Sequence, residues 1–138
     1  MSTTICFDFG NTRLKAAIFT NASLIELRVL ETGSIQEIEK LVAEFAPEKT
    51  ILSSVIHHDK AIETLLSKST QFHLLGPSTQ INFTTPVGKP ETIGADRLAL
   101  IAAAVDQFPN EHNLVISLGT CITYNFINNT QFKRFFSG

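Results

Sequence analysis

The sequence has few of the features that mark secreted, membrane or nucleic-acid-binding proteins. Only two cysteines are present, Cys6 and Cys121, and both lie in apolar runs, which predicts buried, reduced thiols and no disulfide framework. No apolar stretch approaches the roughly 18 residues of a membrane span, and no signal-type segment opens the chain. The net charge of -2 offers no basic surface for nucleic acid or an anionic membrane. These absences predict a cytoplasmic protein that binds neither nucleic acid nor membranes.

The composition that remains is that of a folded globular chain. Its 138 residues are 43% hydrophobic and 17% charged, which excludes a disordered chain and supplies enough apolar material for a core. Adjacent His57 and His58 lack the four-residue spacing that places two metal ligands on one helix face. We therefore predict that both are solvated turn residues.

The stretch 5–19 carries the first informative pattern. An apolar run with the lone Asp8 is followed by Gly10-Asn11-Thr12 and a second apolar run, which predicts a β-hairpin with a tight polar turn. Gly10 allows close approach of a ligand, and the turn amides and the Thr12 hydroxyl can donate to phosphate oxygens. Asp8 would face those phosphates as a carboxylate for Mg²⁺, directly or through water. The alternative is an ordinary hairpin turn.

The stretch 23–75 alternates between strand and helix patterns. A third strand is expected over 23–32, and Ser34 with Glu37 forms a capping box for a helix that Pro47 stops. A buried strand at 50–56, a helix from a cap at Asp59 to about residue 67, and a short strand at 71–75 follow. This periodicity predicts an α/β domain.

A proline- and glycine-rich loop at 76–94 leads into a further helix. The motif Gly94-Ala95-Asp96-Arg97 opens that helix, so Asp96 lies in its first turn. An acid at this place is also favoured by the helix dipole alone, and Arg97 then reads as a solvated surface charge. Both interpretations stay open at this point.

The stretch 114–124 repeats the strand, turn, strand pattern of the first hairpin. Gly119 and Thr120 suit a second phosphate-binding turn, and Ser117 stands where the first hairpin has Asp8. Serine keeps a hydroxyl but lacks the charge of a carboxylate. The residues from 126 onward end in 132–138, where three phenylalanines lie beside two cations. They are expected to be the product of a truncation or frameshift, or a tail without a role of its own; the alternative is a basic-aromatic tail that binds a partner or nucleic acid.

Two of these motifs carry a resemblance to a known family. The motif at 8–12 resembles the first phosphate loop of the actin-like ATPase superfamily. Its Asn-Thr ending, followed in order by Gly-Ala-Asp-Arg at 94–97, is similar to the type III pantothenate kinases, also called the Bvg accessory factor family. The resemblance implies a ribonuclease H-like, actin-like ATPase fold. Residues 1–110 would form the first domain, a three-stranded meander with alternating helices and parallel strands, and 111–138 the first hairpin of a truncated second domain.

The resemblance also implies roles for individual residues. Asp96 would be the general base for the substrate hydroxyl, and Asp8 would hold Mg²⁺. The phosphates of ATP would be bound by Asp8, Gly10, Asn11, Thr12, Lys15, Gly119 and Thr120. Pantothenate would be bound by Phe83, which stands where the family has a tyrosine, and by Gly94, Ala95, Asp96 and Arg97. Ser117 occupies the position connected with a monovalent cation, K⁺ or NH₄⁺, where the family has aspartate.

The implied activity is ATP-dependent phosphorylation of pantothenate to 4'-phosphopantothenate, the first step of coenzyme A biosynthesis. The alternative is a non-catalytic nucleotide- or ligand-binding relative, favoured by Ser117 and by a length about half that of the family. Apolar side chains of the second hairpin and the terminal phenylalanines predict a homodimer or higher self-association that buries them.

Overall fold

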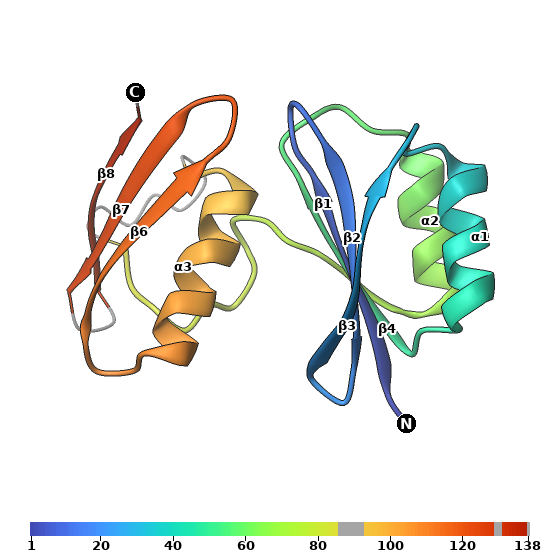
Figure 1. The fold of residues 1–138 in the computed structure, drawn as a ribbon, viewed down its shortest axis with the longest axis horizontal. Coiled ribbons are helices and arrows are strands. Elements are labelled where there is room, and N and C mark those ends of the chain that lie inside the picture. Colours follow the sequence, from blue (N-terminus) through green and yellow to red (C-terminus); the bar gives the residue numbers. More distant parts are fainter. Residues whose placement is uncertain (86–92, 129–130, 138) are drawn as a thin grey trace. The chain divides into compact units, whose positions relative to one another are not determined.

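The computed structural model describes residues 1–85, 93–128 and 131–137, the last of these as backbone only. The chain forms two compact units, Met1–Leu75 and Gly76–Gly138 (Figure 1). This division differs from the boundary expected near residue 110. The helix that opens at residue 95 belongs with the strands that follow it, because its buried side chains share a core with Ile127.

The first unit is built on a five-stranded mixed sheet in the order β3-β2-β1-β4-β5. The antiparallel meander consists of β1 (Thr3–Phe9), β2 (Leu14–Thr20) and β3 (Ser23–Leu30). The strands β4 (Lys49–Ser54) and β5 (Gln71–Leu74) add to it in parallel. The predicted α/β class and the meander followed by parallel strands are therefore confirmed.

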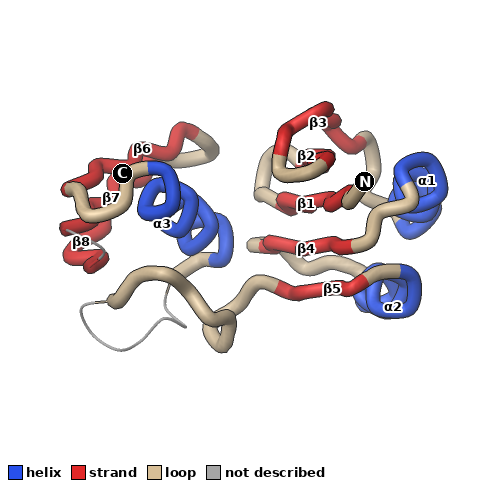
Figure 2. The backbone as a smooth tube through the Cα atoms, turned by 90° about the horizontal axis from the view of Figure 1, so that it is seen from below, coloured by secondary structure: helices blue, strands red, loops and turns tan. Residues whose placement is uncertain are grey.

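Two helices, α1 (Ile35–Phe45) and α2 (Lys60–Ser69), cover one face of this sheet, as Figure 2 shows. Side chains alternate along β1, so Ile5, Phe7 and Phe9 are buried beneath the helices. Cys6 and Asp8 point to the opposite face and are half-buried. The apolar core of the unit thus fixes the direction in which Asp8 points.

The start of α1 differs in one detail from the expected capping box. Ser34 accepts a hydrogen bond from the Glu37 amide at 3.3 Å, as predicted. The Glu37 carboxylate instead accepts from the amides of Glu31, Thr32 and Gly33 at 2.8–3.0 Å. Partial burial works against ionisation, but these hydrogen bonds outweigh it and lower the pKa of Glu37. This one carboxylate therefore organises the β3–α1 connection.

We expect Glu37→Ala to lower the free energy of unfolding by about 1–3 kcal/mol, because three amides lose a charged acceptor. The folded-state pKa lies below the unfolded value, so this contribution is complete above about pH 4.3 and disappears as the pH falls through the folded pKa. Urea denaturation at pH 7 and pH 3 measures it. Glu39→Ala, an exposed position on the same helix, is the control. Equal losses in the two variants would contradict the assignment.

The second unit packs one helix on an antiparallel meander. The helix α3 (Ala95–Gln107) lies on a sheet of β6 (His112–Leu118), β7 (Ile122–Asn128) and β8 (Gln131–Ser137), in that order. The expectation of a tail after residue 126 is wrong, since β8 pairs with β7 as a third strand. No helix in the described ranges is both long enough and apolar enough to cross a membrane.

Both cysteines are free thiols, as expected, but their burial was predicted incorrectly. Cys121 is exposed because it falls in the turn between β6 and β7 and not inside a strand. Cys6 is half-buried on β1, and this burial raises the pKa of its thiol.

Candidate functional site

The first turn joins β1 to β2 through Gly10, Asn11, Thr12 and Arg13. Phe9 and Leu14 form the last cross-strand pair before it, and the Gly10 amide donates to the Arg13 carbonyl oxygen at 3.1 Å. A Cβ atom at Gly10 would lie only 3.1 Å from that same oxygen, so a larger residue would force the turn to shift. The predicted tight turn is confirmed.

Asp8 lies in the middle of a row of polar residues on the face of the sheet opposite α1 and α2. Strand register places Lys15 of β2 on one side of Asp8 and Ser53 of β4 on the other. Ser53 is 8% exposed, and its hydroxyl has no hydrogen-bond partner within the described part of the chain. An unsatisfied buried hydroxyl costs about 1–3 kcal/mol, so this row favours a ligand oxygen or water beside Asp8.

This row was only partly foreseen. Asp8 and Lys15 were predicted from the first motif, whereas Ser53 was not. The pairing of β1 with β4 joins residues 45 positions apart, and no local pattern in the sequence reports that register. No group of three His, Cys, Asp or Glu residues suited to a metal is present among the described residues. Any Mg²⁺ here would therefore depend on Asp8 and on phosphate and water oxygens.

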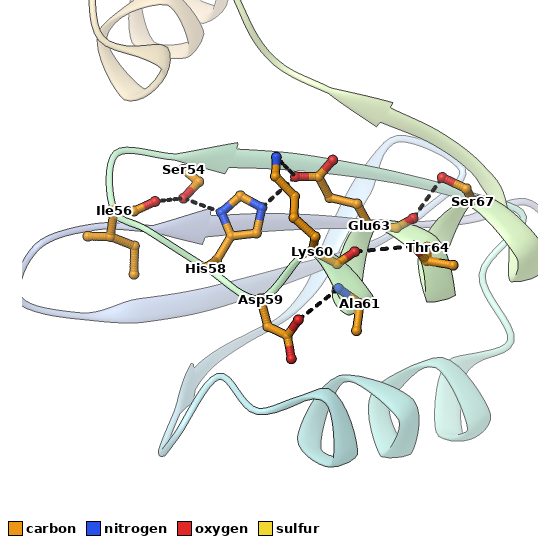
Figure 3. A network of polar contacts seen from close by, with 9 residues as sticks. All are labelled: Ser54, Ile56, His58, Asp59, Lys60, Ala61, Glu63, Thr64 and Ser67. Atoms are coloured by element: carbon orange, nitrogen blue, oxygen red, sulfur yellow. Dashed lines mark hydrogen bonds and ion pairs between the residues drawn. The ribbon is translucent and has the colours of Figure 1, made fainter.

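A second polar network holds the connection between β4 and α2, as Figure 3 shows. Ser54 Oγ donates to the Ile56 carbonyl at 2.9 Å and lies 3.0 Å from His58 Nδ1. His58 Nε2 lies 2.7 Å from a Glu63 carboxylate oxygen, which also accepts from Lys60 at 2.8 Å. The prediction that His58 is solvated is wrong, since its side chain is only 10% exposed.

This network contacts the residue that leads into the first turn. The rings of His58 and Phe9 make a T-shaped contact with centroids 6.0 Å apart, and Phe9 immediately precedes Gly10. The Lys60 hydrogen bond lowers the pKa of Glu63; partial burial opposes this shift and the His58 contact adds to it. His58 therefore packs against the last residue of β1 and connects β4 to α2 through its two ring nitrogens.

The Gly-Ala-Asp-Arg motif opens α3 as predicted. Gly94 precedes the first helical residue without a side-chain cap, and Asp96 Oδ1 accepts from the Arg97 amide at 2.8 Å. Asp96 is exposed and Arg97 is half-buried. One Asp96 carboxylate oxygen thus accepts a hydrogen bond from an amide in the first turn of α3. The helix dipole alone also favours an acidic residue at this place. Thr92 and the loop prolines at 86 and 90 lie outside the described residues.

Phe83 lies in the core of the second unit and not at its surface. It is buried together with Ile93, Leu98, Ile101, Val105 and Ile127. This placement shows a packing role, and its predicted contact with pantothenate stays a prediction.

The second turn is closed by the same kind of backbone hydrogen bond as the first, but it has one residue fewer. Leu118 and Ile122 close the hairpin, and the Gly119 amide donates to the Cys121 carbonyl at 3.2 Å. Ser117 lies one residue before the closing pair, opposite Thr123, as Asp8 lies opposite Lys15. Gly119 and Thr120 are exposed. The two hairpins therefore present equivalent positions, one with a carboxylate and one with a hydroxyl.

Comparison with known proteins identifies the family of this chain. The family model for type III pantothenate kinase matches residues 4–135. A type III pantothenate kinase from Christiangramia forsetii is 40% identical over 123 residues, which are 88% of this chain and 51% of that protein. One from Flavobacterium johnsoniae is 37% identical over 123 residues, with 88% and 50% covered. The chain thus spans about half the length of the curated relatives it matches.

Solved structures support the fold. A Baf family protein from Campylobacter jejuni superimposes with a TM-score of 0.53 at 22% identity, over 97% of this chain and 53% of that one. A Ppx/GppA phosphatase from Aquifex aeolicus gives 0.51 at 17% identity, over 100% and 52%. These likenesses show an actin-like ATPase type of α/β fold. With a family match over nearly its whole length and both sequence motifs at the expected structural positions, the chain belongs to the type III pantothenate kinase family.

Proposed function

We propose that the chain acts in the ATP-dependent phosphorylation of pantothenate to 4'-phosphopantothenate, the first step of coenzyme A biosynthesis, in the cytoplasm. The observation that carries this proposal is the family match over residues 4–135, which includes both motifs to which chemistry is assigned. Because the chain spans about half of its relatives, the activity of the whole protein is itself part of the proposal.

The first turn supplies the phosphate contacts in this proposal. Amides of the Gly10–Arg13 turn and the Thr12 hydroxyl donate to phosphate oxygens, and Lys15 adds a positive charge on the Asp8 side. Asp8 supplies a carboxylate, and the neighbouring Ser53 supplies a buried hydroxyl that has no hydrogen-bond partner within the described residues. Oxygen atoms of this kind suit the binding of Mg²⁺, directly or through its bound waters. Bound Mg²⁺ would neutralise charge on the transferred phosphoryl group. Gly119 and Thr120 of the second turn are the further phosphate contacts.

The α3 N-terminus supplies the acceptor side. Asp96 takes the proton from the pantothenate hydroxyl as that oxygen attacks the γ-phosphorus, and ADP leaves with the electrons of the broken bond. Arg97 pairs with the pantothenate carboxylate. The position assigned to K⁺ or NH₄⁺ has only the neutral hydroxyls of Ser117 and Thr123 in register, without a carboxylate, so no step is assigned to that cation.

The test is an assay of the purified 138-residue chain with ATP, Mg²⁺, K⁺ and pantothenate, with 4'-phosphopantothenate identified by mass spectrometry. Product that depends on both ATP and pantothenate supports the proposal. Nucleotide binding without product would favour the non-catalytic alternative, and turnover only with another acceptor would overturn the choice of substrate.

The homodimer or higher self-association expected from the sequence stays a prediction, which sedimentation at micromolar concentration tests.

We expect Asp8→Asn to weaken Mg²⁺-dependent ATP binding by about 10–100-fold, the size of a lost charge-assisted interaction of about 1.5–3 kcal/mol. Isothermal titration with and without Mg²⁺ measures this change. The difference between variant and wild type should disappear when EDTA removes the metal. Asp59→Asn, which alters only the cap of α2, is the matched control. Unchanged Mg²⁺-dependent affinity in Asp8→Asn would contradict the role.

A further inference from the structure

The segment that joins β4 to α2 leaves the sheet at the same edge as the first turn. The strands β1 and β4 are parallel, and Phe9 at the end of β1 pairs with Ser54 at the end of β4. Beyond that pair, the Val55 amide donates to the Phe9 carbonyl oxygen at 3.0 Å. The carboxyl ends of parallel strands are where open α/β sheets bind ligands. Residues 55–59 therefore start beside the turn that begins at Gly10.

His58 lies in this segment and is bound from two sides (Figure 3). Its Nδ1 atom lies 3.0 Å from the Ser54 hydroxyl oxygen, and its Nε2 atom lies 2.7 Å from a Glu63 carboxylate oxygen. The lowered pKa of Glu63 keeps this carboxylate ionised, so it accepts the hydrogen bond from Nε2. Ser54 ends β4, and Glu63 lies in the first turn of α2. The imidazole thus connects the sheet to the helix.

The His58 ring also contacts β1 at the residue that leads into the first turn. It makes a T-shaped contact with the Phe9 ring, which makes a second such contact with Phe7 at 6.3 Å between centroids. Phe9 is 1% exposed. The segment between β4 and α2 contacts both its side chain, through His58, and its carbonyl oxygen, through Val55. These contacts fix the peptide from which Gly10 continues.

A role limited to starting α2 would not need His58. Asp59 caps that helix, since its side chain accepts from the Ala61 amide at 2.9 Å. The Glu63 carboxylate also accepts from Lys60 at 2.8 Å, so it keeps a partner without the imidazole. The His58 side chain is only 10% exposed and is contacted at both ring nitrogens and by an aromatic ring. Its burial therefore serves the end of β1 more than the start of α2.

We propose that His58 is a positioning residue for ATP, which acts through Phe9 on the Gly10–Arg13 turn. This inference rests on the function proposed above for that turn. The turn is short and closed by the 3.1 Å hydrogen bond from the Gly10 amide to the Arg13 carbonyl oxygen, so a displacement of Phe9 moves its amides together. A misplacement of about 1 Å can cost as much as about 100-fold in function. His58 thus contributes to ATP affinity without being one of the phosphate contacts.

The test measures binding of ATP with Mg²⁺ to the 138-residue chain by isothermal titration. His58→Gln retains an amide donor that can reach Glu63 but has no ring to place against Phe9. Its Kd should rise about tenfold, at the lower end of the losses that follow removal of a supporting partner. The number of sites per chain should stay the same. A role in stability alone would instead lower the number of sites and leave the Kd of the folded protein unchanged.

Two further variants separate the ring contact from the polar contacts. His58→Phe keeps a ring against Phe9 and loses both nitrogens, so it should bind ATP more tightly than His58→Gln does. His57→Gln makes the same substitution at the adjacent, exposed histidine and should bind ATP as the wild type does. In ATP-free protein, the amide NMR signal of Gly10 should shift in His58→Gln and not in His57→Gln. Circular dichroism verifies that each variant is folded.

Four results would overturn the inference. They are an unchanged Kd in folded His58→Gln, an equal loss of affinity in His57→Gln, tighter binding by His58→Gln than by His58→Phe, and a wild-type chain that binds no ATP. The last of these would also overturn the phosphate role of the first turn. ATP binding without phosphorylation of pantothenate would contradict only the proposed reaction, because the order of affinities among the variants is measured on binding alone.

Discussion

Replacing Asp96 by asparagine is expected to lower pantothenate-dependent turnover by about 10²–10⁴-fold, the usual contribution of a general base. Asparagine has nearly the same shape and retains an oxygen that can accept from the Arg97 amide, now 2.8 Å from Asp96 Oδ1. The start of α3 should therefore survive the change. ATP affinity should remain nearly constant, because the phosphate contacts belong to the first and second turns.

Asp106→Asn is the matched control for this substitution. Asp106 is exposed on the same helix, ten residues further on, which is about 15 Å along the axis. Initial rates give kcat and kcat/KM for the 138-residue chain and its variants. A loss in kcat and kcat/KM together indicates an interaction made in the transition state. Unchanged turnover in Asp96→Asn, or an equal loss in Asp106→Asn, would contradict the assignment.

The elements that the sequence predicted are those governed by local rules. Ser34 and Asp59 were identified as helix caps because a short polar side chain before an apolar stripe satisfies free amides, and both make that contact. The turn at Gly10 and the start of α3 at Gly94 followed from residues within a few positions of each other. The order of strands and helices in the first unit was therefore predictable without tertiary information.

The features that were missed depend on contacts between distant segments. Ser53 joins the Asp8 row through the parallel register of β1 and β4, and His58 packs against Phe9, which lies far from it in the sequence. The grouping of α3 with β6–β8 likewise depends on a core shared with Ile127. Phe83 was assigned by resemblance, and only the fold shows it inside that core. The motifs thus indicated the family, while the surroundings of each motif required the structure.

The hairpins β1–β2 and β6–β7 share a turn to which we assign phosphate contacts, but they differ in how their strands are packed. Both turns follow a β-strand with one apolar face, and both place a polar residue one position before the closing pair. In the first unit the helices fix that strand, and with it the direction of Asp8. In the second unit the corresponding side chains of β6, Leu114, Ile116 and Leu118, are exposed among the described residues.

The support beneath Asp8 can be measured through Leu52. This residue is 0% exposed on β4, in register with Phe7 on one side and Leu74 on the other. We expect Leu52→Ala to lower the free energy of unfolding by about 2–5 kcal/mol, because the lost apolar contacts and the cavity left behind both add to the cost. Leu27→Ala removes the same atoms from a position that is 62% exposed, and should cost less than about 0.5 kcal/mol.

Urea denaturation followed by circular dichroism compares the two leucine variants. The chain has no tryptophan and a single tyrosine, Tyr124, so tyrosine fluorescence follows the second unit separately. If Leu52→Ala destabilises the first unit, the circular dichroism transition of this variant should move to a lower urea concentration. The shift should be at least as large as that of its tyrosine fluorescence transition. Because Leu52 packs in the core that directs Asp8, Leu52→Ala should also weaken Mg²⁺-dependent ATP binding in protein that is still folded. Equal stability losses in Leu52→Ala and Leu27→Ala would contradict the packing, and unchanged ATP affinity would show that the phosphate turn does not need this support.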